Sequence, residues 1–156
     1  MKEIREAIYD RLAADASIRT LTGWTASDDR IYYGWPQERV VVDATTPAYL
    51  TYSLSKPVGI PMAMYVEAAQ VEDIIVEIDI WAFKVDGRDD LAERITAIFK
   101  DYAFTTTSYR VMTTRKEAEE DVGEIQEGTG QLDLYRKYIR LRMGSIYKLE
   151  SPYYGG

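Results

Sequence analysis

The segment from Val71 to Phe83 has the clearest alternation of apolar and polar residues in the chain. Successive side chains of a β-strand point to opposite faces, so this alternation predicts a strand with one apolar face. That face holds Ile74, Val76, Ile78, Ile80 and Ala82. The other face holds Ile75, Glu77, Asp79, Trp81 and Phe83. We therefore expect a sheet with one face in the core and a more polar second face.

Further elements follow from the same kind of pattern. Strands are predicted at residues 30–33, 48–53, 105–114 and 132–148. In the last of these, Ile139, Leu141 and Met143 alternate with Tyr138, Arg140 and Arg142. Apolar residues at helical spacing predict helices over residues 3–16 and 87–102, with a short helical turn over residues 17–22. Residues 40–42 resemble a strand, but turn residues follow them at once.

The acidic segment at residues 117–127 is harder to place. It carries six carboxylates in eleven positions, and such a charge run is typical of a solvated segment. It lacks the alternating Asp/Asn ligands and central glycine of a calcium-binding loop. We predict an exposed loop or hairpin tip.

The order of these elements favours an α+β fold. Consecutive strands without regular βαβ alternation indicate a mainly antiparallel sheet with two α-helices packed on one face. We find no internal repeat or low-complexity tract, so residues 1–150 are expected to form a single domain, followed by a flexible C-terminal tail at residues 151–156.

The amino-acid composition excludes several kinds of catalytic and metal-binding site. The 156 residues include neither cysteine nor histidine, which excludes disulfides, thiolate nucleophiles, Ser-His-Asp triads and His-ligated zinc. Carboxylate pairs, a lysine or tyrosine base, or a carboxylate-held Mg²⁺ remain possible. We expect no catalytic residues, no cofactor and no metal. The 13 tyrosines, against 3 phenylalanines, suit half-buried sheet faces and protein interfaces.

Two groups of residues on the predicted polar faces carry candidate chemistry. Glu77 and Asp79 project from one face of a strand, as a hydrolase or metal site requires, but also as a solvated sheet face does. Arg136, Arg140 and Arg142, with Tyr138 between them, suit nucleic acid or pairing with carboxylates of a neighbouring strand or subunit. The net charge of −7 disfavours nucleic acid.

The aromatic segment RIYYGWPQ, residues 30–37, suits either a pocket wall or a strand with its turn. We favour the strand and turn, with Ile31 and one tyrosine packed inward. Tyr33 or Trp35 would then face the first helix or a neighbouring subunit.

Several segments together resemble the tail-completion (tail terminator) proteins of long-tailed bacteriophages. The resemblance begins with IYDRLAADASIRTL, RIYYGWPQ and PAYLTYSLS, at residues 8–21, 30–37 and 47–55. It continues with VEIDIWAF, RDDLAERITAIFKDYAF and YRKYIRLRM, at residues 76–83, 88–104 and 135–143. The sequence departs from the family pattern in a longer connection at residues 56–70 and in the acidic residues 116–131.

The resemblance implies a structural virion protein. Members of that family form a ring, typically of six subunits, that caps the head-proximal end of the tail tube and offers a docking surface to the head. The implied partners are further copies of the chain, the tail tube protein and the head–tail connector proteins, with DNA passing through the lumen without specific binding. The implied locations are the tail–neck junction of the virion and the host cytoplasm during assembly. The candidate subunit interface comprises Glu77, Asp79, Trp81, Arg136, Tyr138, Arg140 and Arg142.

Three alternatives stay open from the sequence. The first is a neck adaptor that binds the portal, the second a small carboxylate-dependent enzyme using Glu77 and Asp79, and the third a nucleic-acid-binding module using the last strand. No apolar run reaches the roughly 18 residues that a membrane-spanning helix needs, so no membrane partner is expected. The charged start of the chain lacks the apolar core of a signal peptide, which predicts a cytoplasmic protein.

Overall fold

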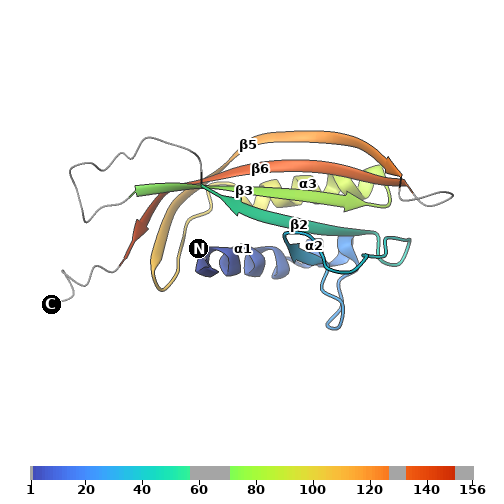
Figure 1. Cartoon of the computed structure of the whole chain (residues 1–156), viewed down its shortest axis with the longest axis horizontal. Helices are drawn as coiled ribbons and strands as arrows, with labels where there is room; N and C mark the ends of the chain where they lie inside the picture. Colours follow the sequence, from blue (N-terminus) through green and yellow to red (C-terminus); the bar gives the residue numbers. More distant parts are fainter. Residues whose placement is uncertain (1, 57–70, 127–132, 150–156) are drawn as a thin grey trace.

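The computed structural model describes residues 2–56, 71–126 and 133–149, which form three helices and a six-stranded sheet (Figure 1). The helices are α1 (Lys2–Ala13), α2 (Ala16–Thr22) and α3 (Val85–Phe99). The strands are β1 (Ile31–Tyr33), β2 (Ala48–Ser55), β3 (Val71–Ala82), β4 (Phe104–Thr105), β5 (Tyr109–Gln126) and β6 (Asp133–Lys148).

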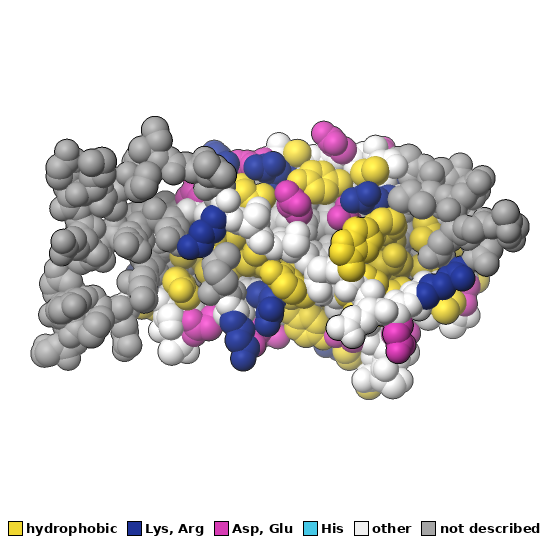
Figure 2. Space-filling view, in the orientation of Figure 1, with side chains coloured by type: hydrophobic (Ala, Val, Ile, Leu, Met, Phe, Trp, Pro, Cys, Tyr) yellow, Lys and Arg dark blue, Asp and Glu magenta, His cyan; other side chains and the backbone are white. Residues whose placement is uncertain are grey.

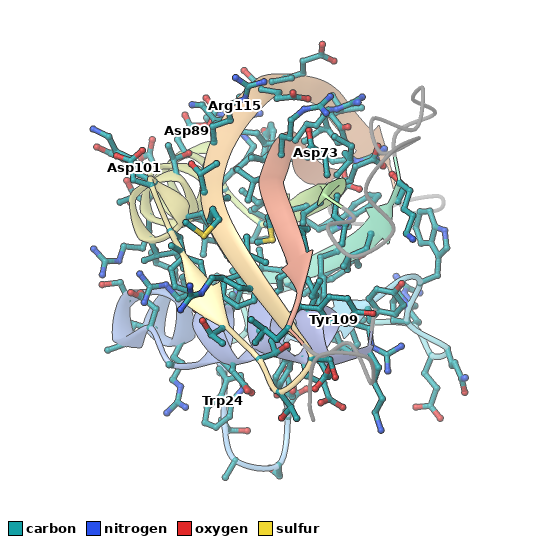
Figure 3. The ribbon with its side chains drawn as sticks, turned by 90° about the vertical axis from the view of Figure 1, so that its left-hand side faces the viewer. Trp24, Asp73, Asp89, Asp101, Tyr109 and Arg115 are labelled. Carbon is teal, nitrogen blue, oxygen red and sulfur yellow. The ribbon has the colours of Figure 1, made fainter. Side chains whose placement is uncertain are left out.

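The sheet has the strand order β1-β2-β3-β6-β5-β4. Only β1 and β2 pair in parallel, and all other neighbours are antiparallel. The predicted α+β class with a mainly antiparallel sheet is confirmed. Seen along the sheet, α1 lies beneath it and α3 to one side (Figure 3).

One face of the sheet forms the main core with the helices. The five residues predicted for the inner face of β3 are all buried there, opposite Ile139, Leu141 and Met143 of β6. Ile4, Ile8 and Leu12 of α1 and Leu91, Ile95 and Phe99 of α3 cover them. The period-2 pattern of the strands and the helical spacing of the apolar residues therefore meet in one buried layer.

The sequence predicted one helix over residues 3–16, but α1 ends at Ala13 and α2 begins at Ala16. The Oδ1 atom of Asp15 accepts a hydrogen bond from the Ile18 N–H at 3.0 Å and caps a separate helix, α2. Arg94 of α3 binds the same carboxylate at 2.6 Å. Because its carboxylate is bonded to Arg94, Asp15 has a lowered pKa. The short helical turn predicted at residues 17–22 is confirmed as part of α2.

The acidic segment was predicted to be an exposed loop or hairpin tip, and this prediction is wrong for residues 117–126. Residues 109–126 form the single strand β5, paired with β6 along its length. The prediction failed because the face of β5 nearer the helices carries Lys116, Glu119 and Asp121, so no apolar alternation marks the strand. The strand predicted over residues 105–114 is likewise interrupted, since Thr106 and Tyr109 close a turn between β4 and β5.

The connection between β1 and β2 crosses the other face of the sheet without forming a strand, although its valines resemble one. Val40 and Val42 are buried against Tyr49, Trp81 and Leu134 in a second, smaller cluster. The Arg30 side chain is 2% exposed and holds this connection in place. It donates hydrogen bonds to the carbonyl oxygens of Val41, Thr46 and Ala48 at 2.7, 3.2 and 3.1 Å.

Most of the loop predicted at residues 56–62 and the flexible tail predicted at residues 151–156 lie outside the described residues.

Gly23 gives a first test of this arrangement. It ends α2 with φ of 74°, and an added Cβ would meet the Thr45 carbonyl oxygen at 2.7 Å. We expect Gly23→Ala to lower the free energy of unfolding by about 1–3 kcal/mol, because the residue is left-handed and has no room to move. The measurement is urea-induced unfolding followed by circular dichroism.

The matched control is Gly87→Ala in α3, where an added Cβ meets nothing within 4 Å. This variant should be unchanged or stabilised by up to about 1 kcal/mol, as expected for alanine in a helix. Equal stability of the two variants would contradict the close approach of α2 to residues 45–47.

Candidate interaction surface

The candidate residues lie on the face of the sheet turned away from the helices, since the alternate residues of β3 and β6 form the core with those helices. Figure 2 shows hydrophobic, basic and acidic side chains intermingled on the molecular surface in the view of Figure 1. The cross-strand register brings all seven predicted interface residues onto this face. Trp81 lies opposite Arg136, Asp79 opposite Tyr138, and Glu77 opposite Arg140, with Arg142 in the next row. Their positions agree with the predicted alternation, and their role as a subunit interface stays a prediction. We call this surface the open face.

An aromatic stack lies at one end of the open face. The rings of Tyr49 and Trp81 are stacked, with centroids 5.8 Å apart and planes 5° apart. On the other side of Trp81, the Arg136 guanidinium lies over the ring at 4.7 Å from the centroid. Trp81 Nε1 donates a hydrogen bond to Thr51 Oγ1 at 3.2 Å. Trp81 is therefore fixed in position by contacts on β2, β3 and β6.

Trp35 lies above this stack and faces solvent. Its ring centroid is 6.0 Å from that of Trp81, yet its side chain is 76% exposed. An exposed indole next to an aromatic stack is typical of an interface anchor, because tryptophan is enriched among the residues that carry most of the binding energy.

The segment RIYYGWPQ is a strand followed by a turn, as favoured from the sequence. Ile31 is buried in the main core, and Tyr32 packs edge-to-face on Tyr49. Tyr33 contacts the first helix, with the Arg5 guanidinium 4.7 Å from its ring centroid. Gly34 follows with φ of 71°, which turns the chain so that Trp35 lies over the sheet.

Asp79 and Glu77 lie in the middle of the open face. Arg136 binds the Oδ1 atom of Asp79 through both Nε and Nη2, each at 2.8 Å. Burial raises the pKa of Asp79, and the hydrogen bond from Arg136 opposes the rise. Burial also raises the pKa of the Tyr138 hydroxyl, which interacts with Glu77. Both carboxylates thus have partners within the subunit.

Glu117 joins two of the arginines, which the sequence did not predict. The register between β5 and β6 shifts between Lys116 and Ala118, and this bulge turns Glu117 toward the open face. Its carboxylate binds Arg140 at 3.2 Å and also Arg142. The sequence pattern could not indicate these contacts, because a bulge of this kind leaves no signal in it and the acidic residues favour a loop or hairpin tip.

Arg142 has a second carboxylate partner. Its Nη1 atom binds Asp73 of β3 at 3.0 Å. In Figure 3, Asp73 and Arg115 lie at the top of the molecule, on the far side from α1 and Trp24. The three arginines of the predicted stripe are therefore bonded to Asp79, Glu117 and Asp73. This pairing matches the carboxylate interpretation of the stripe and leaves less positive charge for phosphates.

The described residues contain no group of three or more Asp and Glu side chains placed to hold a metal ion. Glu77 and Asp79 do line a hollow of about 210 Å³ beside Trp35. None of the helices described is long and apolar enough to cross a membrane.

Comparisons with known proteins extend this description. No protein-family model matches the sequence, and no curated protein matches it at a significant level. A solved chain from the virion of a native gene transfer agent particle aligns with 88% of this chain and 90% of its own length. That alignment has a TM-score of 0.58 and 13% sequence identity. A second solved structure covers 97% of this chain and 98% of its own, with a TM-score of 0.50 and 13% identity. The fold is therefore shared over almost the whole chain.

The ion pairs of Glu117 predict a dependence of stability on pH. The hydrogen bond from Arg142 lowers the pKa of Glu117 in the folded protein. A lowered pKa means that the carboxylate stabilises the fold above its unfolded pKa, and that this stabilisation is lost as the pH falls through the folded value. We expect the free energy of unfolding of Glu117→Gln at pH 7 to be about 0.5–1 kcal/mol lower than that of the natural protein.

The difference between Glu117→Gln and the natural protein should close as the pH is lowered below about 4, near the ordinary glutamate pKa. Thermal unfolding at pH 7, 5, 4 and 3 measures it. Glu93→Gln, at an exposed position of α3, serves as the control and should show no such convergence. A Glu117→Gln deficit that persists unchanged at pH 3 would contradict an ionic cause.

Proposed function

We propose that this protein is a structural subunit of a phage-like virion that forms a ring at the head-proximal end of the tail tube. In this role it ends polymerisation of the tube and joins the tail to the head. The fold shared with a gene transfer agent virion chain, over 88% of this chain, is the observation that carries the proposal. The resemblance of several segments to tail terminator proteins supports the more specific position.

The open face supports a role in assembly. It presents an exposed tryptophan over a rigid aromatic stack, surrounded by charged side chains, and such apolar patches with polar rims mark interaction sites. Contacts between two different patches of neighbouring copies generate a closed ring when the rotation between subunits closes. Six copies are proposed, with the seven residues of the predicted interface at the contact.

The proposed partners follow from this position. One side of the ring would bind the tail tube protein and the other the head–tail connector, while DNA passes through the lumen without specific binding. The net charge of −7 per chain suits such a lumen, because repulsion keeps DNA from adhering to it. The protein would assemble in the host cytoplasm and remain in the virion.

The test is the mass of the purified protein over a wide concentration range, by light scattering, with negative-stain images of the same samples. We expect closed rings of about six times the 17.9 kDa subunit mass, formed alone or on added tail tubes. Arg140→Glu should weaken ring formation at least tenfold while leaving the thermal unfolding midpoint within a few degrees, because Arg140 is half-exposed and belongs to the predicted interface.

Co-sedimentation with tail tubes and with portals of the same virion separates the two positions. Binding to tubes supports the terminator, whereas binding to portals alone would identify a neck adaptor. A monomer that binds neither would overturn the proposal.

A further inference from the structure

The hollow beside Trp35 is rich in hydrogen-bond acceptors. Its walls are formed by Gly34, Trp35, Thr51, Ser53, Glu77 and Asp79, and its volume is about 210 Å³. Asp79 uses its Oδ1 atom for Arg136, and Thr51 Oγ1 accepts from Trp81. Two carboxylates and one exposed indole thus border this space, and none of the described residues that line it is cationic, although Arg136 binds Asp79 from beside it. The group that best complements such walls is a guanidinium or an ammonium.

Most cationic side chains in the described part of the chain already have a partner within the subunit, which is a carboxylate, a carbonyl or an aromatic ring. Lys100 and Arg110 are exposed and make no such contact with described residues. Lys100 follows α3, and Arg110 of β5 pairs with Thr105 of β4. Both therefore lie at the β4 edge of the sheet.

The hollow and the β4 edge are far apart in one subunit. The hollow lies over β2 and β3 beside Glu77, whereas Arg110 on β5 lies in the row of Tyr147 and Val71. Val71 is six residues from Glu77 along β3, about 20 Å at the usual rise per residue, and β5 is two strands from β3. Figure 1 shows the turn between β4 and β5 at the lower left and the segment after β1 toward the right. Lys100 and Arg110 cannot reach the hollow of their own subunit, but those of a second copy can.

We infer that the hollow beside Trp35 receives Lys100 or Arg110 from a neighbouring copy of this chain. The contact joins two different patches at opposite ends of the sheet, which is the head-to-tail geometry that a ring requires. The cationic group would lie against the Trp35 ring and pair with Glu77. This inference rests on the proposed ring, and it names the contact between its subunits.

The experiment uses two variants of the full chain. The first variant, Trp35→Ala with Glu77→Gln, removes the indole and one carboxylate from the hollow. The second variant, Lys100→Gln with Arg110→Gln, removes both cationic side chains. Each variant alone lacks one half of every contact, so each should associate at least tenfold more weakly than the natural protein. A mixture of the two retains a single intact contact per pair and should give a heterodimer of about twice the 17.9 kDa subunit mass.

The control replaces the second variant with Lys2→Gln combined with Lys84→Gln, which removes two positive charges away from the β4 edge. This control should assemble as the natural protein does. Thermal unfolding of every variant verifies that it is folded.

The outcomes separate this contact from the proposed function. Heterodimers in the mixture support the contact even if the natural protein forms open chains, which would overturn the ring alone. A mixture that stays monomeric at the highest concentration reached, or a control that associates as weakly as the cation variant, would overturn the contact.

Discussion

The buried guanidinium of Arg30 is the interaction on which the open face depends. An arginine that is 2% exposed is tolerated only when its donors are satisfied, and here three backbone carbonyls accept from it while Asp28 lies 3.6 Å from Nη1. These carbonyls belong to the connection after β1 and to the start of β2. Arg30 therefore fixes an irregular segment that no strand pairing holds, and with it Val40 and Val42 against the aromatic stack. Without these hydrogen bonds, the segment that carries Val40 and Val42 would be less firmly held over Tyr49 and Trp81.

The main architecture was predictable because burial imposes a regular period. Ile78 and Ile80 must face the core, so Glu77, Asp79 and Trp81 must face away, and the same argument places Arg140 on the open face. The alternation of apolar and polar residues is absent from β5, because the side chains of this strand pack against few apolar neighbours. The contacts of Glu117 depend on a bulge, and the position of Trp35 depends on its contact with Trp81 of β3. Both are tertiary effects between residues far apart in sequence, which no local pattern encodes.

Charged side chains along the outer edge of β5 oppose non-specific pairing with other strands. Within the described residues, β4 pairs with only two residues of β5, so much of this strand has a free edge. Open edges attract other strands, and bulges and charged side chains are the common means of preventing it. The register shifts after Lys116 and after Asp121, together with the carboxylates between them, make non-specific sheet extension unfavourable. The acidic segment thus has a structural reason to be acidic without binding a cation.

Pairing within the subunit also determines which charges remain for a partner. Arg136, Arg140 and Arg142 are each paired with carboxylates of their own subunit, so substituting one of them acts on an interface through the carboxylates that it leaves unpaired there. A contact between copies draws on groups that the fold leaves unsatisfied, because only those gain a partner on association. Lys100 and Arg110 make no carboxylate, carbonyl or aromatic contact within the described residues. Glu77 and Asp79 beside Trp35 already contact Tyr138 and Arg136, but each carboxylate can accept further hydrogen bonds. Since the two patches differ in sign, like patches of two copies repel each other and unlike patches attract, which is the pairing that the proposed head-to-tail ring needs.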